Sequence, residues 1–369
     1  MKVPFSFLTE QFSDPEPIFE SIRNFLKRCD FTLGEDLLEF EKKYATYTGA
    51  KHAVGVGTGT DALSLSLKML GVGAGDEVIT PPNSFFATTG AIVQTGATPV
   101  FVDAAAGDLN IDVSQIEAAI GKKTKAIVPV HWAGCPADMP AIMALAKKHG
   151  LFVVEDACQA LGARIGGQHV GTFGDAAGFS CHPLKPLHVW GDGGVIITNS
   201  DELAEKLRLY RNHGMEDRDT IRFWGVNSRF DNLHAIVGNY VFETLDETIE
   251  TRIAHATRYD AALDCKELAA HLEVPKRTPE NRHVFHLYKI QVKDRTGLLE
   301  HLKAAGVEAK IHYPTPLHLQ PAATALGHKK GDFPVTENEA AHTLTLPCHQ
   351  YLSSEQIDYT IEKVRQYYA

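Results

Sequence analysis

The chain has 369 residues, and its 36 basic and 46 acidic side chains give a formal net charge of −10. This balance argues against a general nucleic-acid-binding protein, which needs a basic face, and no run of about 18 apolar residues predicts a membrane span. The start of the chain has no apolar signal segment, and the six cysteines include no Cys-x-x-Cys pair. We therefore expect a cytoplasmic protein of about two domains, with no nucleic-acid or membrane partner and no zinc site.

Short apolar runs alternate with helical stretches between about residues 50 and 240. The expected strands cover residues 52–57, 77–80, 99–102, 125–130 and 151–154, and the expected helices cover 61–70, 87–94, 113–120 and 139–149. Strands that alternate with helices, and that are apolar almost throughout, are typical of a parallel sheet buried on both faces. The pattern therefore predicts an α/β fold whose large domain has a mostly parallel sheet flanked by helices.

The remainder of the chain has a different pattern, which predicts a smaller α+β domain. Its expected elements are a long helix over 232–259, a strand over 284–292, a helix over 297–305, a strand over 308–312 and an amphipathic helix over 355–367. We place the boundary near Leu245. Residues 1–245 then form an N-terminal arm and the large domain, and residues 246–369 form the small domain.

Polar residues follow several of the expected strands, at the edge where open parallel sheets bind ligands. The segment Gly57-Thr58-Gly59-Thr60-Asp61 runs directly into a helix, and the free N–H groups of a helix start favour a phosphate. Asp156 ends a buried strand, and Lys185 lies in a polar turn that precedes Gly191-Asp192-Gly193-Gly194. A phosphate site, a carboxylate and an amine are therefore expected on one rim.

Pyridoxal phosphate (PLP) requires that combination of groups. A carboxylate beside its ring nitrogen keeps that nitrogen protonated, so that the ring accepts electrons from a substrate carbanion. A lysine amine forms the Schiff base with its aldehyde, where substrate amines exchange. Asp156 and Lys185 supply these two groups, so the sequence predicts a PLP site.

Seven motifs support this prediction by their order along the chain. They are Thr58-Gly59-Thr60-Asp61-Ala62-Leu63, Gly75-Asp76-Glu77-Val78-Ile79, Glu155-Asp156-Ala157-Cys158-Gln159, Ser180-x-x-x-x-Lys185, Gly191-Asp192-Gly193-Gly194, Asn227-Ser228-Arg229 and His312-Tyr313-Pro314. Together they resemble the DegT family of sugar aminotransferases, fold-type-I PLP enzymes, over nearly the whole chain. The resemblance implies amino transfer from an amino acid, expected to be L-glutamate, to a keto sugar, expected to be a nucleotide-linked 3-keto hexose. Such a reaction serves amino-sugar biosynthesis for surface polysaccharides or secondary metabolites.

The resemblance also implies roles for individual residues. Lys185 matches the Schiff-base lysine, and Asp156 matches the partner of the ring nitrogen. The other implied cofactor contacts are Gly59, Thr60, Asp61 and Ser180 at the phosphate, Phe85 stacked on the ring, Gln159 at the ring hydroxyl and Asn227 at the phosphate of the neighbouring subunit. Because Asn227 reaches across, a homodimer with shared active sites is implied.

The implied substrate contacts include Arg229, a candidate for carboxylate recognition from the neighbouring subunit, and His312. His182 and His188 are further candidates, in segments where this chain departs from the family pattern. The chain also has Asn83 where relatives often have an aromatic residue. These departures surround the expected pocket, so the sugar stays open.

Three alternatives remain beside this interpretation. Gly57-Thr58-Gly59-Thr60-Asp61-Ala62 fits the G-x-G-x-x-A form of a Rossmann-type NAD(P)-dependent oxidoreductase. However, the candidate ribose-binding acid, Glu77, starts its strand instead of ending it, and that enzyme leaves Asp156 and Lys185 unexplained. A PLP lyase on the same fold stays open. A non-catalytic sensor is disfavoured by the intact Lys185, which also favours transamination over the dehydration catalysed by relatives with His at this position.

Overall fold

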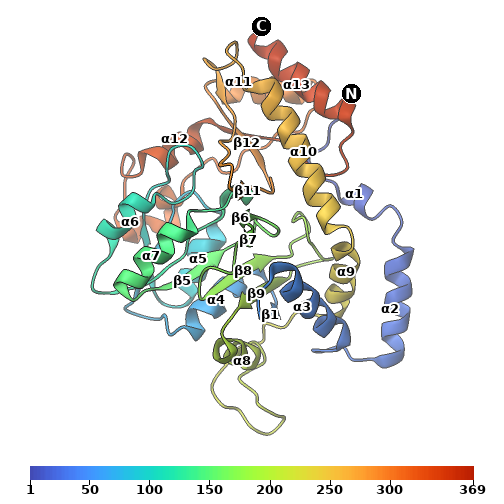
Figure 1. Ribbon diagram of the computed structural model, residues 1–369, viewed down its shortest axis with the longest axis vertical. Coiled ribbons are helices and arrows are strands. Elements are labelled where there is room, and N and C mark those ends of the chain that lie inside the picture. Colours follow the sequence, from blue (N-terminus) through green and yellow to red (C-terminus); the bar gives the residue numbers. More distant parts are fainter.

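The computed structural model describes residues 1–369 and contains two units, each with its own hydrophobic core. A seven-stranded sheet forms the centre of the larger unit (Figure 1). In spatial order its strands are β1 (His52–Val56), β9 (Gly194–Thr198), β8 (Ala176–Ser180), β5 (Phe152–Asp156), β4 (Thr124–Ile127), β2 (Glu77–Thr80) and β3 (Thr98–Phe101).

The direction of the strands brings three carboxyl ends to one rim. The four neighbouring pairs from β8 to β3 are parallel, whereas β9 is antiparallel to both β8 and β1. Two reversals cancel, so β1 runs in the same direction as β8 and β5. The predicted α/β class with a mostly parallel sheet is confirmed. The topology contradicts the Rossmann alternative, because β1 lies at the sheet edge and does not pair with β2, which carries Glu77.

Helices cover both faces of this sheet. Ala53 and Val54 are neighbours along β1, yet they pack into different hydrophobic clusters, because successive side chains of a strand point to opposite faces. Thus both faces are buried, as the apolar strand sequences predict. The helices of this unit are α1 (Leu8–Gln11), α2 (Glu16–Arg28), α3 (Glu35–Thr48), α4 (Gly59–Met69), α5 (Phe86–Gln94), α6 (Val113–Ala119), α7 (Met139–His149), α8 (Asp201–Tyr210) and α9 (Asn232–Phe242).

The second unit is smaller and has an antiparallel sheet, β10 (Leu272–Glu273), β12 (Tyr288–Val292) and β13 (Thr343–Leu346). Its helices are α10 (Leu245–Leu263), α11 (Arg295–Ala304), α12 (Pro334–His342) and α13 (Ser354–Tyr368). The two chain ends lie close to this unit (Figure 1). Val3 packs into its core, and the Val3 N–H donates to the carbonyl of Gly306 at 2.9 Å. The N-terminal arm therefore lies on the smaller unit, although it precedes the larger one in sequence.

The single helix expected over 232–259 is two helices, α9 and α10, separated at residues 243–244. Leu245 and Ile249 at the start of α10 belong to the core of the larger unit, whereas Ala256 and Tyr259 belong to that of the smaller unit. Thus α10 passes from one core to the other (Figure 1). We propose to keep the domain boundary near Leu245, with α10 as the element that joins the two domains.

Two expected strands of the small unit also differ. Residues 308–312 form only isolated bridges, including Lys310 with Thr345. The strand expected over 284–292 shortens to β12, because the N–H groups of Val284 and Leu287 donate to the carbonyls of Gly134 and Ala133 in the larger unit. These hydrogen bonds hold residues 284–287 at the junction of the two units. Across the whole chain, no helix combines the length and the apolar character that a membrane span requires.

Candidate active site

A cavity of about 540 Å³ lies at the carboxyl ends of β1, β5 and β8, where it meets the smaller unit. The predicted residues that line it are Gly59, Thr60, Phe85, Asp156, Gln159, Ser180, His182, Lys185 and His312. These residues come from five separate segments of the chain. The rim predicted from strand ends is therefore a real concave site, and its wall is completed by the N-terminal arm and by the segment before β12.

The first turn of α4 forms the floor of an anion site. The N–H groups of Gly59 and Thr60 have no helical partners, because the first N–H groups of a helix never do. A Cβ at Gly59 would lie 2.8 Å from Cβ of Ser180, so only glycine lets α4 approach β8 this closely. Asp61 does not line the cavity: its N–H donates to Oγ1 of Thr58 at 2.9 Å. The donors left for an anion are those of Gly59, Thr60 and Ser180.

Asp156 ends β5 as a buried carboxylate with fixed orientation. Its Oδ2 accepts a hydrogen bond from Oγ1 of Thr88 at 2.7 Å, and its Oδ1 accepts one from the N–H of Cys158 at 3.1 Å. A carboxylate has about four acceptor positions, so these two contacts leave capacity for a further N–H donor. Thr88 was not predicted, since a threonine inside an apolar helix has no distinctive pattern.

Lys185 presents its amine to the same cavity, with Nζ 3.5 Å from Nε2 of His286. Burial lowers the pKa of Lys185, although the nearby Cys158 and Asp156 oppose the shift. Burial also holds the pKa of His286 well below its ordinary value, and the positive charges of Lys185 and Arg252 add to this effect. A neutral imidazole therefore faces the amine, and its Nε2 can accept a hydrogen bond from it.

Aromatic side chains form one wall. Phe85 lies at the start of α5, with its ring centroid 5.6 Å from that of Tyr313. Phe85 is 39% exposed and lines the cavity, so part of its ring is accessible to a planar ligand. Gln159 also faces the cavity, although its Oε1 already accepts from the N–H of Ala133 at 2.8 Å.

The histidines predicted around the pocket have different positions. His182 and His312 line the cavity, and Nδ1 of His312 lies 2.9 Å from Oγ1 of Thr345. His188 does not line it: the side chain is fully buried behind Lys185, and its Nδ1 donates to the carbonyl of Lys185 at 2.8 Å. Contact with substrate is therefore not supported for His188, which instead holds the backbone of the lysine.

Asn227 and Arg229 lie outside the cavity of their own chain. They lie where the loop that follows α8, which extends away from the larger unit (Figure 1), returns to it: Ser228 between them is buried, and its Oγ donates to Oδ2 of Asp61 at 2.9 Å. Asn227 is exposed, and Arg229 donates to Oδ1 of Asn212 at 3.3 Å. Within one chain, therefore, neither side chain reaches the ligand site.

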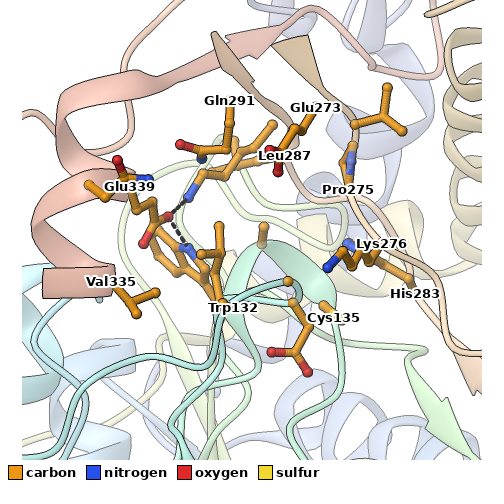
Figure 2. Close-up of a pocket in the computed structure, with 18 residues that line it drawn as sticks. Trp132, Cys135, Glu273, Pro275, Lys276, His283, Leu287, Gln291, Val335 and Glu339 are labelled. Carbon is orange, nitrogen blue, oxygen red and sulfur yellow. Dashed lines mark hydrogen bonds and ion pairs between the residues drawn. The ribbon is translucent and has the colours of Figure 1, made fainter. Parts of the chain in front are cut away.

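Asn83, where the chain departs from the family pattern, also points away from the cavity. Its Nδ2 donates to Oε2 of Glu339 at 2.7 Å, and Glu339 also accepts from Nε1 of Trp132 at 2.7 Å and pairs with Lys289. Figure 2 shows Glu339 and Trp132 at a second cavity of about 130 Å³ between the two units. The substitution at Asn83 therefore serves the junction of the units and does not shape the ligand site.

Two further cavity residues, His286 and Arg252, were not predicted. His286 lies in the segment before β12, and Arg252 lies within a predicted helix without any distinguishing pattern. Both reach the site because α10 and the segment before β12 meet at the junction. No local signal could have identified them.

A cavity lysine, a buried strand-end carboxylate and a free helix N-terminus, set on a mostly parallel sheet, define an aminotransferase of fold type I. The comparison with protein families is specific: the profile of the DegT/DnrJ/EryC1/StrS aminotransferase family matches residues 13–365. The chain therefore belongs to this family and is an aminotransferase.

Individual relatives match over most of their lengths. A protein of Geobacillus stearothermophilus named pleiotropic regulatory protein is 44% identical over 100% of this chain and 99% of its own. The dTDP-3-amino-3,4,6-trideoxy-alpha-D-glucose transaminase of Streptomyces venezuelae is 38% identical over 91% of this chain and 88% of its own. The crystal structure of NtdA from Bacillus subtilis with bound cofactor PMP superimposes with a TM-score of 0.92 at 32% identity, covering 100% of this chain and 85% of that one.

Proposed function

We propose that this enzyme uses PLP to transfer an amino group from L-glutamate to a nucleotide-linked 3-keto hexose, in amino-sugar biosynthesis. The observation that carries the proposal is the arrangement of Lys185, Asp156 and the free N–H groups of α4 around one cavity. The transaminase of Streptomyces venezuelae supports the sugar class, because its name places the amino group at position 3 of a nucleotide-linked sugar.

The residues of the cavity fit this cofactor. The N–H groups of Gly59 and Thr60 and the hydroxyl of Ser180 would hold its phosphate, Asp156 its ring nitrogen, Gln159 its ring hydroxyl and Phe85 one ring face. The unused acceptor capacity of the buried Asp156 matches a protonated ring nitrogen in particular. When bound, PLP supplies an aldehyde that takes up the amine and a ring that stabilises negative charge on the substrate carbon.

The chain's own groups then perform the steps around it. Lys185 carries the amine that the donor displaces and that afterwards moves the proton at the substrate carbon, for which its lowered pKa suits it. Asp156 would keep the ring nitrogen of the bound cofactor protonated. His182 and His312 would orient the sugar from the cavity wall. After 2-oxoglutarate leaves, the same groups perform these steps in reverse on the keto sugar.

The name of the Geobacillus relative raises regulation as a second function. A purely regulatory protein would need neither an amine nor a buried carboxylate in a cavity of this kind. The retention of Lys185 and Asp156 at the site favours catalysis.

The test is a two-part assay of the PLP-loaded protein. L-Glutamate should be converted to 2-oxoglutarate in a single turnover, and a panel of dTDP- and UDP-linked 3-keto hexoses should then accept the amino group. Mass spectrometry of the sugar product identifies the acceptor. A protein that takes up no PLP, or that converts no amino donor, would contradict the proposal.

We also propose that the enzyme is a homodimer in which Asn227 and Arg229 enter the partner's active site. The segment that carries them exposes large apolar side chains, including Trp224 at 87% exposure and Ile221 at 51%. Exposed apolar surface of this kind is typical of an interface between proteins. Asn227 would contact the cofactor phosphate and Arg229 a substrate carboxylate in the neighbouring subunit.

Mixed dimers should reveal this sharing. A Lys185→Ala subunit and an Asn227→Ala subunit are each expected to give weakly active or inactive homodimers. When both are mixed, one site of each heterodimer combines an intact Lys185 with an intact Asn227, so activity should return to as much as half the wild-type value per heterodimer. The measurement is the rate after unfolding and refolding the two together. Activity that does not rise above the sum of the separate variants would show that each site is built from one chain.

A further inference from the structure

Arg252 is a buried cation at the active-site cavity that has no carboxylate partner. It lies on α10, is only 3% exposed and lines the same cavity as Lys185. Its Nε and Nη2 donate to Oε1 of Gln350 at 3.2 and 3.0 Å, and its Nη1 donates to the carbonyl of His286 at 3.4 Å. A guanidinium has five N–H groups, so these three contacts leave two without an acceptor.

The other buried arginine of the chain has the carboxylate partner that Arg252 lacks. Arg211 is 4% exposed, pairs with the buried carboxylate of Glu41 and donates to the carbonyl of Gly55 at 2.6 Å. Buried charges are normally paired, because removal from water is otherwise too costly. Burial lowers the pKa of Arg252 to about 10, which still leaves the side chain charged at neutral pH. A charged, buried and unpaired arginine at a cavity requires an anion from outside the chain.

The groups around Arg252 add no negative charge. The Phe7 ring of the N-terminal arm lies against it, with its centroid 5.3 Å from Cζ. Neither of the two carboxylates that line the cavity, Asp156 and Asp192, pairs with Arg252. The other titratable side chains of the cavity wall are Lys185, His182, His286, His312, His349, Cys158, Cys348, Tyr288 and Tyr313. Asp156, which also lines the cavity, is engaged by Thr88 and Cys158. This side of the cavity therefore favours an anionic ligand.

The position of Arg252 limits which anionic ligand it can bind. His286 contacts both cations: its Nε2 lies 3.5 Å from Nζ of Lys185, and its carbonyl accepts from Nη1 of Arg252 at 3.4 Å. An amino-acid donor carries its α-carboxylate on the very carbon whose proton Lys185 moves, so this carboxylate must lie close to the amine. The diphosphate of a nucleotide-linked sugar is several bonds from the reacting carbon, and so it lies further away.

We infer that Arg252 binds the α-carboxylate of the amino-acid donor, an inference that rests on the proposed aminotransfer. The two free N–H groups supply charge-assisted hydrogen bonds, which are among the strongest available to a carboxylate. With Arg229 of the partner subunit proposed for a carboxylate as well, two arginines match the two carboxylates of L-glutamate. Arg252 is thus a substrate-binding residue that selects an amino acid over a simple amine.

The donor half-reaction of the PLP-loaded enzyme, run without any sugar, tests this inference. Arg252→Gln should lower kcat/KM for L-glutamate by about 100-fold, as expected when one partner of a buried charged contact is lost. The KM for the keto sugar in the second half-reaction should stay unchanged. Arg258→Gln is the matched control, since Arg258 lies on the same helix but is exposed and pairs with Asp358.

Binding without turnover gives an independent readout. 2-Methyl-L-glutamate keeps both carboxylates but has no α-proton, so its dissociation constant can be read from the change in cofactor absorbance. Arg252→Gln should raise this constant about 100-fold, whereas 4-aminobutyrate, which lacks the α-carboxylate, should bind the variant and the wild type alike. If Arg252→Gln does not fold, Arg252→Lys, which keeps the charge without the planar fork, should still raise the constant by about 10-fold.

The outcomes separate this inference from the proposed function. If the wild type reacts with L-glutamate but the Arg252 variants bind 2-methyl-L-glutamate as tightly as the wild type does, the role of Arg252 is wrong. The proposed function is then unaffected. Loss confined to the sugar half-reaction would assign the arginine to an anionic group of the sugar nucleotide and would also overturn the inference. A wild type that reacts with no amino acid would refute the proposed function and this inference together.

Discussion

Replacing Lys185 with alanine should reduce amino transfer by about 10⁴-fold or more, because the variant loses both the amine that the donor displaces and the base that moves the proton. The cavity would keep its phosphate donors and Asp156, so the variant should still bind pyridoxamine phosphate. The measurements are single-turnover rates with L-glutamate and a binding titration with pyridoxamine phosphate. In the wild type, borohydride should fix PLP covalently to the peptide that contains Lys185.

Two further variants sharpen this experiment. Lys185→Arg keeps the positive charge, yet it should be as inactive as the alanine variant, because a guanidinium neither releases its proton nor forms the covalent bond. Lys310→Ala removes an exposed lysine outside the cavity and should leave the rate unchanged. Substantial activity in Lys185→Ala, or borohydride labelling at another lysine, would assign the nucleophile elsewhere.

Replacing Asp156 with asparagine should lower kcat by about 10³-fold, a loss typical of removing one preorganised electrostatic partner. The amide is similar in size and can still accept from Thr88, but it carries no charge to keep the ring nitrogen protonated. The carboxylate is buried and held by two hydrogen bonds at the end of β5, so no nearby acid can take its place. The rate of the half-reaction with L-glutamate is the measurement.

The affinity for the cofactor should fall much less than the rate, since the phosphate donors of α4 and Ser180 are untouched by this change. Asp358→Asn, at an exposed ion pair of α13, is the control and should behave as wild type. A rate within threefold of wild type for Asp156→Asn would mean that the ring nitrogen needs no charged partner in this enzyme.

The local pattern was sufficient for most elements of the larger unit. The strand over 77–80 and the helix over 139–149 begin and end where the apolar runs and the Gly150 stop signal indicate. The strand expected over 308–312 did not form, because its backbone has two different partners: the N–H of Glu308 donates to the carbonyl of Val3 in the N-terminal arm, whereas Lys310 exchanges hydrogen bonds with Thr345. Long-range packing of this kind has no local signature.

The residues of the candidate site also include some that the local sequence identified correctly and some that it did not. Asp156 and Lys185 were identified because polar residues at strand ends of a parallel sheet have a functional reason to be there. His188 lies only three residues after Lys185, yet its side chain does not line the cavity and is buried against Phe7 and Phe12. Sequence position places a residue near a site, but the backbone direction decides which way the side chain points.

By itself, the sequence determined which chemical groups follow which strands, since hydrophobic periodicity and turn residues act over a few positions. It therefore specified the amine, the carboxylate and the phosphate donors of the site. Only the tertiary structure decided the reversal of β9, which brings the end of β1 to the same rim, and the passage of α10 between the two cores, which brings Arg252 to Lys185. Both depend on contacts between distant segments, whose free energies come from packing and are not contained in any local pattern.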